Sequence, residues 1–335
     1  MKIDNKNITK GFKKDDRLEK VLFELNDELK DSFSDKLEHP NKPIILIMGC
    51  ARSGSTLLLQ YLSQTGLFSY PTNLIARFYK NPYLGIKIQQ ALLDFDPLNQ
   101  IGFELTDKQY SSKLGKTFGA LAPSEFWYFW RQYFDFSKRQ YNFLNKENLS
   151  AINSDSFLKK IAAFELITSK PLVMKGMMLN WNIPFLHKMY DKFIFVNLER
   201  DIIVNGQSLL NARKKYFNDI ETWYSFKPKE YDDLKNRPAQ EQVIGQVYYT
   251  QKAVKEGLKL VPNKNKITIS YENFCKNPIG LVEEVQKKFT QLNTKLSAKT
   301  LSEENKKVVF TPNKELMLSI EELESMSNFL KRIQS

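Results

Sequence analysis

The segment IILIMGCARSGST, residues 44–56, sets the architecture that we expect for the whole chain. Its first five residues, Ile44 to Met48, form a continuous apolar run, which is typical of a strand buried on both faces of a parallel sheet. The loop GCARSGST follows with glycines at its first and sixth positions, and LLLQYLSQ after it reads as a helix. A strand, a glycine-containing loop and a helix in this order predict a phosphate-binding loop, because backbone N–H groups at a helix N-terminus attract anions.

The loop departs from the pattern GxxxxGK[ST] of nucleotide triphosphatases and kinases. Ser55 stands where that pattern has its lysine, which reaches the β- and γ-phosphates. A basic residue is instead present three residues earlier, as Arg52. The loop is therefore expected to bind an anion, and an ordinary strand-to-helix turn is the alternative.

Three later segments repeat the strand pattern: PLVMK at 171–175, FIFVNL at 193–198 and KITIS at 266–270. Helices are expected over residues 203–214 and 241–259. Strands that alternate with helices predict an α/β fold with three layers, in which a central parallel sheet is flanked by helices.

The chain divides into an N-terminal helical extension, residues 1–42, and a single domain over residues 43–335. Within this domain, residues 81–170 are rich in aromatic side chains and are expected to form a mainly helical insertion on the acceptor side. Residues 215–245 are expected to form a lid-like segment. Apolar residues at helical spacing in the extension are Leu18, Val21, Leu22 and Leu25.

Composition limits the kinds of partner. The chain has 335 residues and a formal charge of +12, which favours anionic partners such as phosphorylated small molecules. The basic residues are scattered, so no nucleic acid is expected, while a peripheral membrane contact stays open. Two cysteines and two histidines predict neither a disulfide framework nor a metal site. No signal peptide and no apolar run of about 20 residues are visible, so we expect a cytoplasmic protein without a transmembrane segment.

The segment Arg52-Ser53-Gly54-Ser55-Thr56 resembles the 5′-phosphosulfate loop, [KR]SG[ST][ST], of sulfotransferases that use 3′-phosphoadenosine 5′-phosphosulfate (PAPS). A second likeness follows the strand 193–198, where Ser208 lies eight residues beyond Arg200. This spacing is similar to that of the family's 3′-phosphate site. It also has a physical reason, because an arginine at a strand end and a serine two turns into the next helix can converge on one phosphate.

Weaker likenesses complete the donor site that the family implies. Lys175 ends a strand where related enzymes carry a lysine near the sulfuryl group, and Tyr271 begins a YENF segment that resembles the family's adenine side. Ser302 and Asn305 resemble a nucleotide-covering loop of tyrosylprotein sulfotransferases. The branch that resembles this chain most contains bacterial carbohydrate and tyrosylprotein enzymes. The donor residues implied are Arg52, Ser53, Gly54, Ser55, Thr56, Lys175, Arg200, Ser208, Tyr271, Ser302 and Asn305.

The resemblance implies transfer of a sulfuryl group from PAPS to an acceptor hydroxyl, with 3′-phosphoadenosine 5′-phosphate (PAP) as the product and no metal. Arg52 and Lys175 are the cations expected to stabilise the charge that develops during transfer. The acceptor hydroxyl needs a general base, but residues 69–73 hold no Glu or His at the family position. Glu125, in an aromatic stretch, is the first choice, with helix capping as its alternative, and Glu104 is the second.

The acceptor is expected to be a carbohydrate or glycolipid. Arg77, Trp127 and Trp130 are the residues that we expect to face it, although aromatic runs are more often core. Two other functions stay open on the sequence alone. One is a nucleotide kinase with a degenerate loop, and the other is a non-catalytic binder of anionic polymers.

Overall fold

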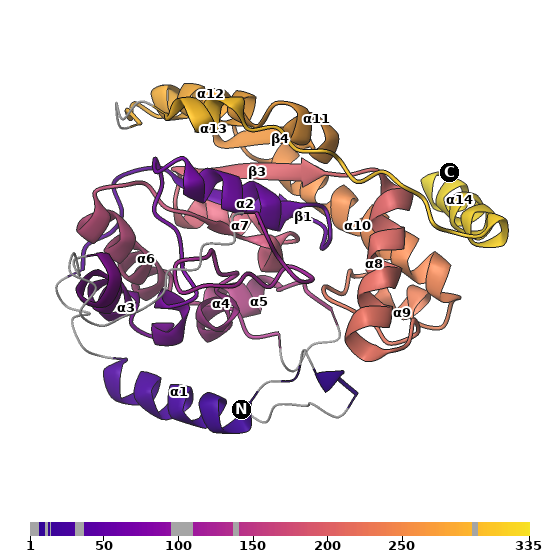
Figure 1. Ribbon diagram of the computed structural model, residues 1–335, viewed down its shortest axis with the longest axis horizontal. Helices are drawn as coiled ribbons and strands as arrows, with labels where there is room; N and C mark the ends of the chain where they lie inside the picture. Colours follow the sequence, from indigo (N-terminus) through magenta and orange to yellow (C-terminus); the bar gives the residue numbers. More distant parts are fainter. Residues whose placement is uncertain are drawn as a thin grey trace.

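The centre of the computed structural model is a parallel sheet whose strand order is β2-β1-β3-β4 (Figure 1). The strands are β1 (Ile44–Gly49), β2 (Val173–Lys175), β3 (Phe193–Glu199) and β4 (Lys266–Ser270). The structure describes residues 7–10, 13, 15–30, 37–94, 110–136, 141–296 and 301–335. All four predicted strands are confirmed, and the three-layer α/β fold with them.

Helices connect and cover these strands. The helices before β2 are α1 (Asp16–Leu29), α2 (Ser55–Gln64), α3 (Pro82–Gln89), α4 (Trp127–Tyr133), α5 (Lys146–Ser150) and α6 (Ser154–Thr168). Those between β2 and β4 are α7 (Ile183–Met189), α8 (Ile202–Phe217), α9 (Tyr231–Leu234) and α10 (Ala239–Lys259). The last are α11 (Tyr271–Lys276), α12 (Pro278–Gln291), α13 (Glu303–Lys307) and α14 (Ile320–Gln334). Short turns are η3 (Ile75–Phe78), η4 (Gln90–Asp94), η5 (Met177–Leu179) and η6 (Asn263–Asn265).

Strand β1 is buried on both faces, as its unbroken apolar run predicts, whereas the edge strand β4 is partly exposed. Ile44, Leu46 and Met48 belong to a core that includes residues of α4, α6, α7, α8 and α10. Ile45 and Ile47 point to the other face and pack with residues of α2, α11 and α12. Successive side chains of a strand alternate between its faces, so six consecutive apolar or small residues serve two cores at once.

The turn after β1 depends on Gly49. Its φ is +128°, and a Cβ there would lie 2.6 Å from the backbone oxygen of Leu198 in β3. Gly49→Ala is therefore expected to lower the free energy of unfolding by about 2–4 kcal/mol, measured by urea denaturation. Gly206→Ala is the control, because Gly206 lies inside α8 and its closest neighbour is the flexible end of the Ile244 side chain. A Gly49→Ala protein as stable as wild type would contradict this reading of the turn.

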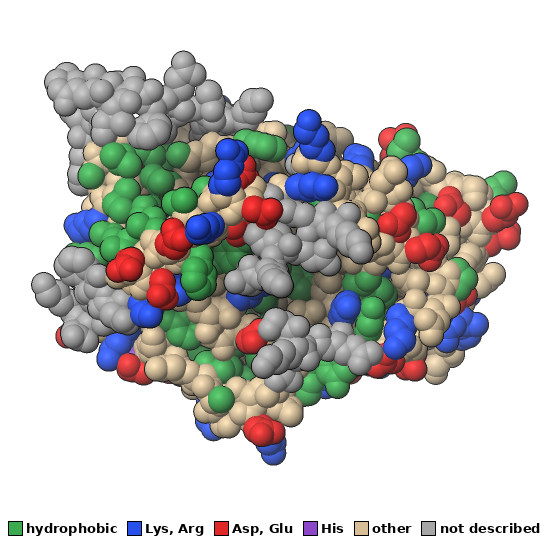
Figure 2. All heavy atoms as spheres, turned by 90° about the horizontal axis from the view of Figure 1, so that it is seen from below, with side chains coloured by type: hydrophobic (Ala, Val, Ile, Leu, Met, Phe, Trp, Pro, Cys, Tyr) green, Lys and Arg blue, Asp and Glu red, His purple; other side chains and the backbone are tan. Residues whose placement is uncertain are grey.

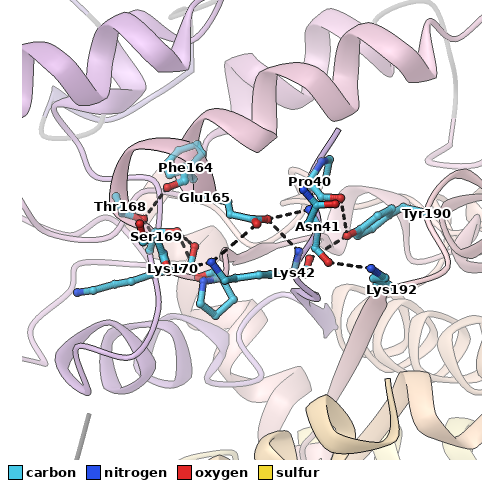
Figure 3. A network of polar contacts seen from close by, with 12 residues as sticks. Pro40, Asn41, Lys42, Phe164, Glu165, Thr168, Ser169, Lys170, Tyr190 and Lys192 are labelled. Carbon is cyan, nitrogen blue, oxygen red and sulfur yellow. Dashed lines mark hydrogen bonds and ion pairs between the residues drawn. The ribbon is translucent and has the colours of Figure 1, made fainter. Parts of the chain in front are cut away.

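A network of polar contacts fixes the chain where it enters β1 (Figure 3). The Glu165 carboxylate of α6 accepts hydrogen bonds from the backbone N–H groups of Asn41 and Lys42, both at 2.9 Å. The Tyr190 hydroxyl is 2.9 Å from the backbone oxygens of Pro40 and Lys42. Polar groups of α6 and of the residue after α7 thus hold β1 in register with its neighbours.

The predicted N-terminal helix exists as α1, and its Leu22 and Leu25 are half-buried. Leu18, Val21 and Phe23 are exposed, and Figure 2 shows hydrophobic side chains gathered on the left of the face where α1 lies. The buried residue of α1 is Asn26, whose amide donates to the Arg77 carbonyl at 2.7 Å. The helix therefore docks against η3 through a buried amide.

The expected insertion and lid contribute short helices and loops. Residues 81–170 include α3 to α6, and residues 215–245 include α9 and the start of α10. After α13 the chain runs without regular structure to α14, which packs on α8 and α10 (Figure 1). In the described residues, we find no helix of the length and apolarity that spanning a bilayer requires. The division into domains and the cytoplasmic location stay predictions.

Candidate functional site

A cavity of about 350 Å³ lies where β1, β2 and β3 end. The carboxyl ends of parallel strands meet at one edge of a sheet, and ligands of α/β folds bind there. The cavity wall comes from the loop after β1, the end of β2, the start of α8, the 112–115 loop and the 224–226 segment. Residues far apart in the sequence therefore share one site.

The loop after β1 exposes the N-terminus of α2 to this cavity. Gly54 is the N-cap residue with φ +99°, and no side chain caps the helix there. Gly54, Ser55 and Thr56 line the cavity, so the first N–H groups of the helix face it. A Cβ at Gly54 would lie 2.4 Å from the Tyr271 ring, so only glycine fits between this ring and the loop.

Arg200 and Ser208 both line the cavity, as their spacing predicts. The Arg200 guanidinium donates to the Arg52 carbonyl at 2.9 Å and to the Asn313 carbonyl at 2.6 Å. It also lies over the Tyr271 ring, 4.6 Å from the centroid. Burial lowers the pKa of Arg200, whereas Tyr271 and Glu272 act to raise it. The guanidinium is thus held between the phosphate loop and the C-terminal segment.

Among the described residues, three buried donors of the phosphate loop and of Arg200 lack partners: Arg52 Nε, Ser53 Oγ and Arg200 Nε. The two arginines line the cavity, and Ser53 is buried within the loop. A buried polar group without a hydrogen bond costs about 1–3 kcal/mol. Two of the three belong to guanidinium groups, which suit phosphate and sulfate oxygens. The residues present therefore fit a ligand that carries more than one anionic group.

A second cluster joins β2, α2 and the residues before α4. Lys175 is buried, and its Nζ lies 2.7 Å from Thr56 Oγ1 and 2.6 Å from Glu125 Oε1. The other carboxylate oxygen of Glu125 accepts a hydrogen bond from the Trp127 indole. Glu125 thus does not cap α4, whose N-cap residue is Phe126. A cation, a hydroxyl and a carboxylate stand together beside the phosphate loop.

Sequence reasoning missed the residues that close the cavity. Tyr224, Ser225 and Phe226 come from the segment expected to be a lid, without a motif to single them out. Asn313 and Glu315 come from the irregular segment before α14. Gln207 of α8 holds this segment, because its amide donates to the Glu315 carbonyl at 2.8 Å. None of these residues follows a spacing rule that the sequence alone reveals.

The structure places some of the predicted site residues at the cavity and others away from it. Cavity-lining residues named from the sequence are Arg52, Gly54, Ser55, Thr56, Glu125, Trp127, Lys175, Arg200, Ser208 and Tyr271. Ser53 is fully buried within the same loop. Ser302 and Asn305 lie elsewhere: Ser302 caps α13, and the Asn305 amide donates to the Gln64 carbonyl. Glu104 lies outside the described residues.

Two expected acceptor residues are corrected by their surroundings. Trp130 is 1% exposed and packs against Phe129, Phe134 and Phe157, so it belongs to the aromatic core. Arg77 is exposed at the end of η3 and does not line the cavity. Trp127 is the first residue of α4 and lines the cavity, whereas Phe129 and Trp130 form the buried face of the same helix.

A protein-family model described as the sulfotransferase family matches residues 43–291. The chain belongs to the sulfotransferase family. Residues 43–291 contain both the phosphate loop and the Arg200–Ser208 pair. A search of curated proteins finds no match for this sulfotransferase.

Solved structures of sulfotransferases match the chain at low sequence identity. Sulfotransferase STF9 from Mycobacterium avium is 13% identical, with a TM-score of 0.54, over 95% of this chain and 84% of that one. A sulfotransferase from Alicyclobacillus acidocaldarius is 14% identical, with a TM-score of 0.43, over 87% and 92% of the two chains. STF1 from Mycobacterium tuberculosis H37Rv is 12% identical, with a TM-score of 0.47, over 92% and 80%. In the part of this sulfotransferase that the structure describes, no three His, Cys, Asp or Glu side chains cluster as metal ligands would.

Proposed function

We propose that this sulfotransferase moves a sulfuryl group from PAPS to a hydroxyl of a carbohydrate or glycolipid. The observation that carries the proposal is the pair of unpartnered buried Nε groups of Arg52 and Arg200, two arginines that line one cavity. These groups match the two anionic ends of PAPS, which bears a 3′-phosphate and a 5′-phosphosulfate. The sulfotransferase family generally uses this donor.

The two ends of the donor find different partners. The open N-terminus of α2 and the Arg52 guanidinium suit the 5′-phosphosulfate, because helix N–H groups and a cation lie together there. Arg200 and Ser208 suit the 3′-phosphate, and the Tyr271 ring beneath the guanidinium suits the adenine side. ATP lacks a 3′-phosphate, so the Arg200–Ser208 pair argues against the kinase alternative.

Lys175 and Glu125 supply the chemistry. When transfer occurs, the acceptor oxygen bonds to sulfur and the bond from sulfur to the bridging phosphate oxygen breaks, leaving its electron pair on PAP. Lys175 stabilises the negative charge that develops on the oxygens around sulfur. Glu125 takes the proton of the acceptor hydroxyl, as a general base. Since Lys175 Nζ lies 2.6 Å from Glu125 Oε1, both groups reach the same point.

The acceptor half of the proposal rests on the other end of the cavity. Trp127 and Phe226 form an aromatic wall there, with ring centroids 5.6 Å apart. Sugar rings stack on such walls, while Ser112 and Ser225 offer hydroxyls to the same space. A carbohydrate headgroup matches this mixture of aromatic and hydroxyl side chains.

Transfer of radioactive sulfate from labelled PAPS tests the proposal directly. The acceptors offered are an oligosaccharide, a glycolipid, a simple phenol and a tyrosine peptide, with ATP as the competing donor. Label on the sugar of the oligosaccharide or glycolipid is the expected result. Label on the phenol or peptide alone would contradict the acceptor class, and phosphate transfer from ATP would favour the kinase.

A further inference from the structure

Tyr224 is a cavity residue that belongs to neither of the two clusters described above. It lines the cavity, and its ring packs against Tyr216 with centroids 5.6 Å apart. Among the described residues, the one hydrogen bond of its hydroxyl is long, 3.5 Å to the Leu114 carbonyl. This distance is at the outer limit of a hydrogen bond, so the proton is available to a better acceptor.

The Tyr224 hydroxyl contacts the 112–115 loop, and the same loop borders the reacting groups. The residue after Leu114 is Gly115, where a Cβ would lie 3.4 Å from Glu125 Oε1 and 3.5 Å from Thr56 Oγ1. These two oxygens are the ones that Lys175 Nζ contacts. The Tyr224 hydroxyl and the Lys175 cluster thus lie beside neighbouring residues of the 112–115 loop, Leu114 and Gly115.

The buried Gln246 side chain of α10 fixes the backbone of the segment that carries Tyr224. Gln246 is 1% exposed, and its amide donates to the carbonyls of Tyr224 at 2.8 Å and Phe226 at 2.7 Å. Ser225 between them has φ +71°, a left-handed conformation that needs such support. The segment 224–226 is therefore held in one geometry by a helix of the core, which is what a precise hydrogen-bond donor requires.

The hydroxyl also keeps its proton. Burial raises the pKa of Tyr224 to about 12, and the nearby Glu125 charge adds to this, while the Arg52 charge opposes it. At neutral pH the phenol is thus an uncharged donor within the electrostatic influence of Arg52 and Glu125. A fixed neutral donor can stabilise charge on the transferring group without competing with Glu125 as a base.

We infer that Tyr224 is a further catalytic residue, which donates a hydrogen bond from its hydroxyl to an oxygen of the sulfuryl group. The inference rests on the proposed function, because it needs PAPS as the donor. It adds a third donor to Lys175 and Arg52, from a segment without a sulfotransferase motif. The contact exists with PAPS and is absent with PAP, since PAP has lost the sulfuryl group.

This difference between the two nucleotides gives a test that needs no acceptor. Affinities for PAPS and for PAP are measured by calorimetry on wild type, Tyr224→Phe and the control Tyr216→Phe. Tyr224→Phe should weaken PAPS roughly tenfold, equivalent to about 1.4 kcal/mol, and leave PAP unchanged. Tyr216→Phe should change neither affinity, because Tyr216 does not line the cavity.

The other possible outcomes distinguish a wrong inference about Tyr224 from a wrong proposed function. Equal weakening of both nucleotides by Tyr224→Phe would make the tyrosine a packing residue, and no change in either would remove it from the donor site. Both results overturn the inference while PAPS remains the donor. If wild type binds neither nucleotide, the proposed function itself is wrong and the inference falls with it.

Discussion

Lys175→Ala is expected to lower kcat by roughly a hundred- to a thousandfold on the best acceptor, with PAP affinity nearly unchanged. Lys175 is buried at the end of β2, where its ammonium lies within 2.7 Å of Thr56 and Glu125. A cation in such a dry position stabilises developing charge far more than it would in water. PAP carries no sulfuryl group, so its binding does not report this contact.

The control for this variant is Lys276→Ala, which removes an exposed lysine of α11. It should leave kcat at the wild-type value. Thermal unfolding of Lys175→Ala is measured alongside, because Glu125 loses its ion pair in this variant. A folded Lys175→Ala enzyme with near-normal kcat would remove Lys175 from the reaction.

Glu125→Gln should reduce kcat by about a hundred- to ten-thousandfold, which is the range of general base catalysis. The amide keeps the shape of the side chain and one carbonyl oxygen, which can accept from Lys175 or from the Trp127 indole but not from both, and it cannot take a proton. The donor site is expected to stay intact, so the loss should appear in kcat and leave PAP affinity as it is. Rates are measured over pH 5 to 9 with saturating PAPS.

Glu147→Gln serves as the matched control, since Glu147 lies in the first turn of α5 and outside the cavity. Its kcat should equal that of wild type. If Glu125→Gln retains wild-type kcat across the pH range, Glu125 only positions Lys175, and another group accepts the proton.

The sheet could be predicted because its signal is local. Strands β1, β2 and β3 are short, mainly apolar runs that end in a glycine or a charged residue, and burial on both faces explains the lack of alternation in β1. The donor half of the site followed for a related reason. Arg52 lies in the loop that follows β1. Arg200 follows the end of β3, and Ser208 lies in α8, so local structure also fixes their positions.

The acceptor half could not be predicted in the same way, because tertiary packing decides which aromatic side chains face the cavity. Trp127 and Trp130 are three positions apart in one stretch, yet one lines the cavity and the other is core. Tyr224 and Asn313 reach the site from irregular segments, held by Gln246 and Arg200. Such contacts depend on long-range geometry that no spacing rule encodes.

Calorimetric titration with PAP, AMP and ATP, on wild type and Arg200→Ala, tests the central claim most directly. PAP and AMP differ only in the 3′-phosphate, which Arg200 and Ser208 are proposed to bind. Wild type should bind PAP at least a hundredfold more tightly than AMP or ATP, and Arg200→Ala should lose most of this preference, since a bidentate arginine–phosphate contact is worth about 1.5–3 kcal/mol or more. Equal affinity for PAP and AMP, or a preference for ATP, would contradict PAPS as the donor.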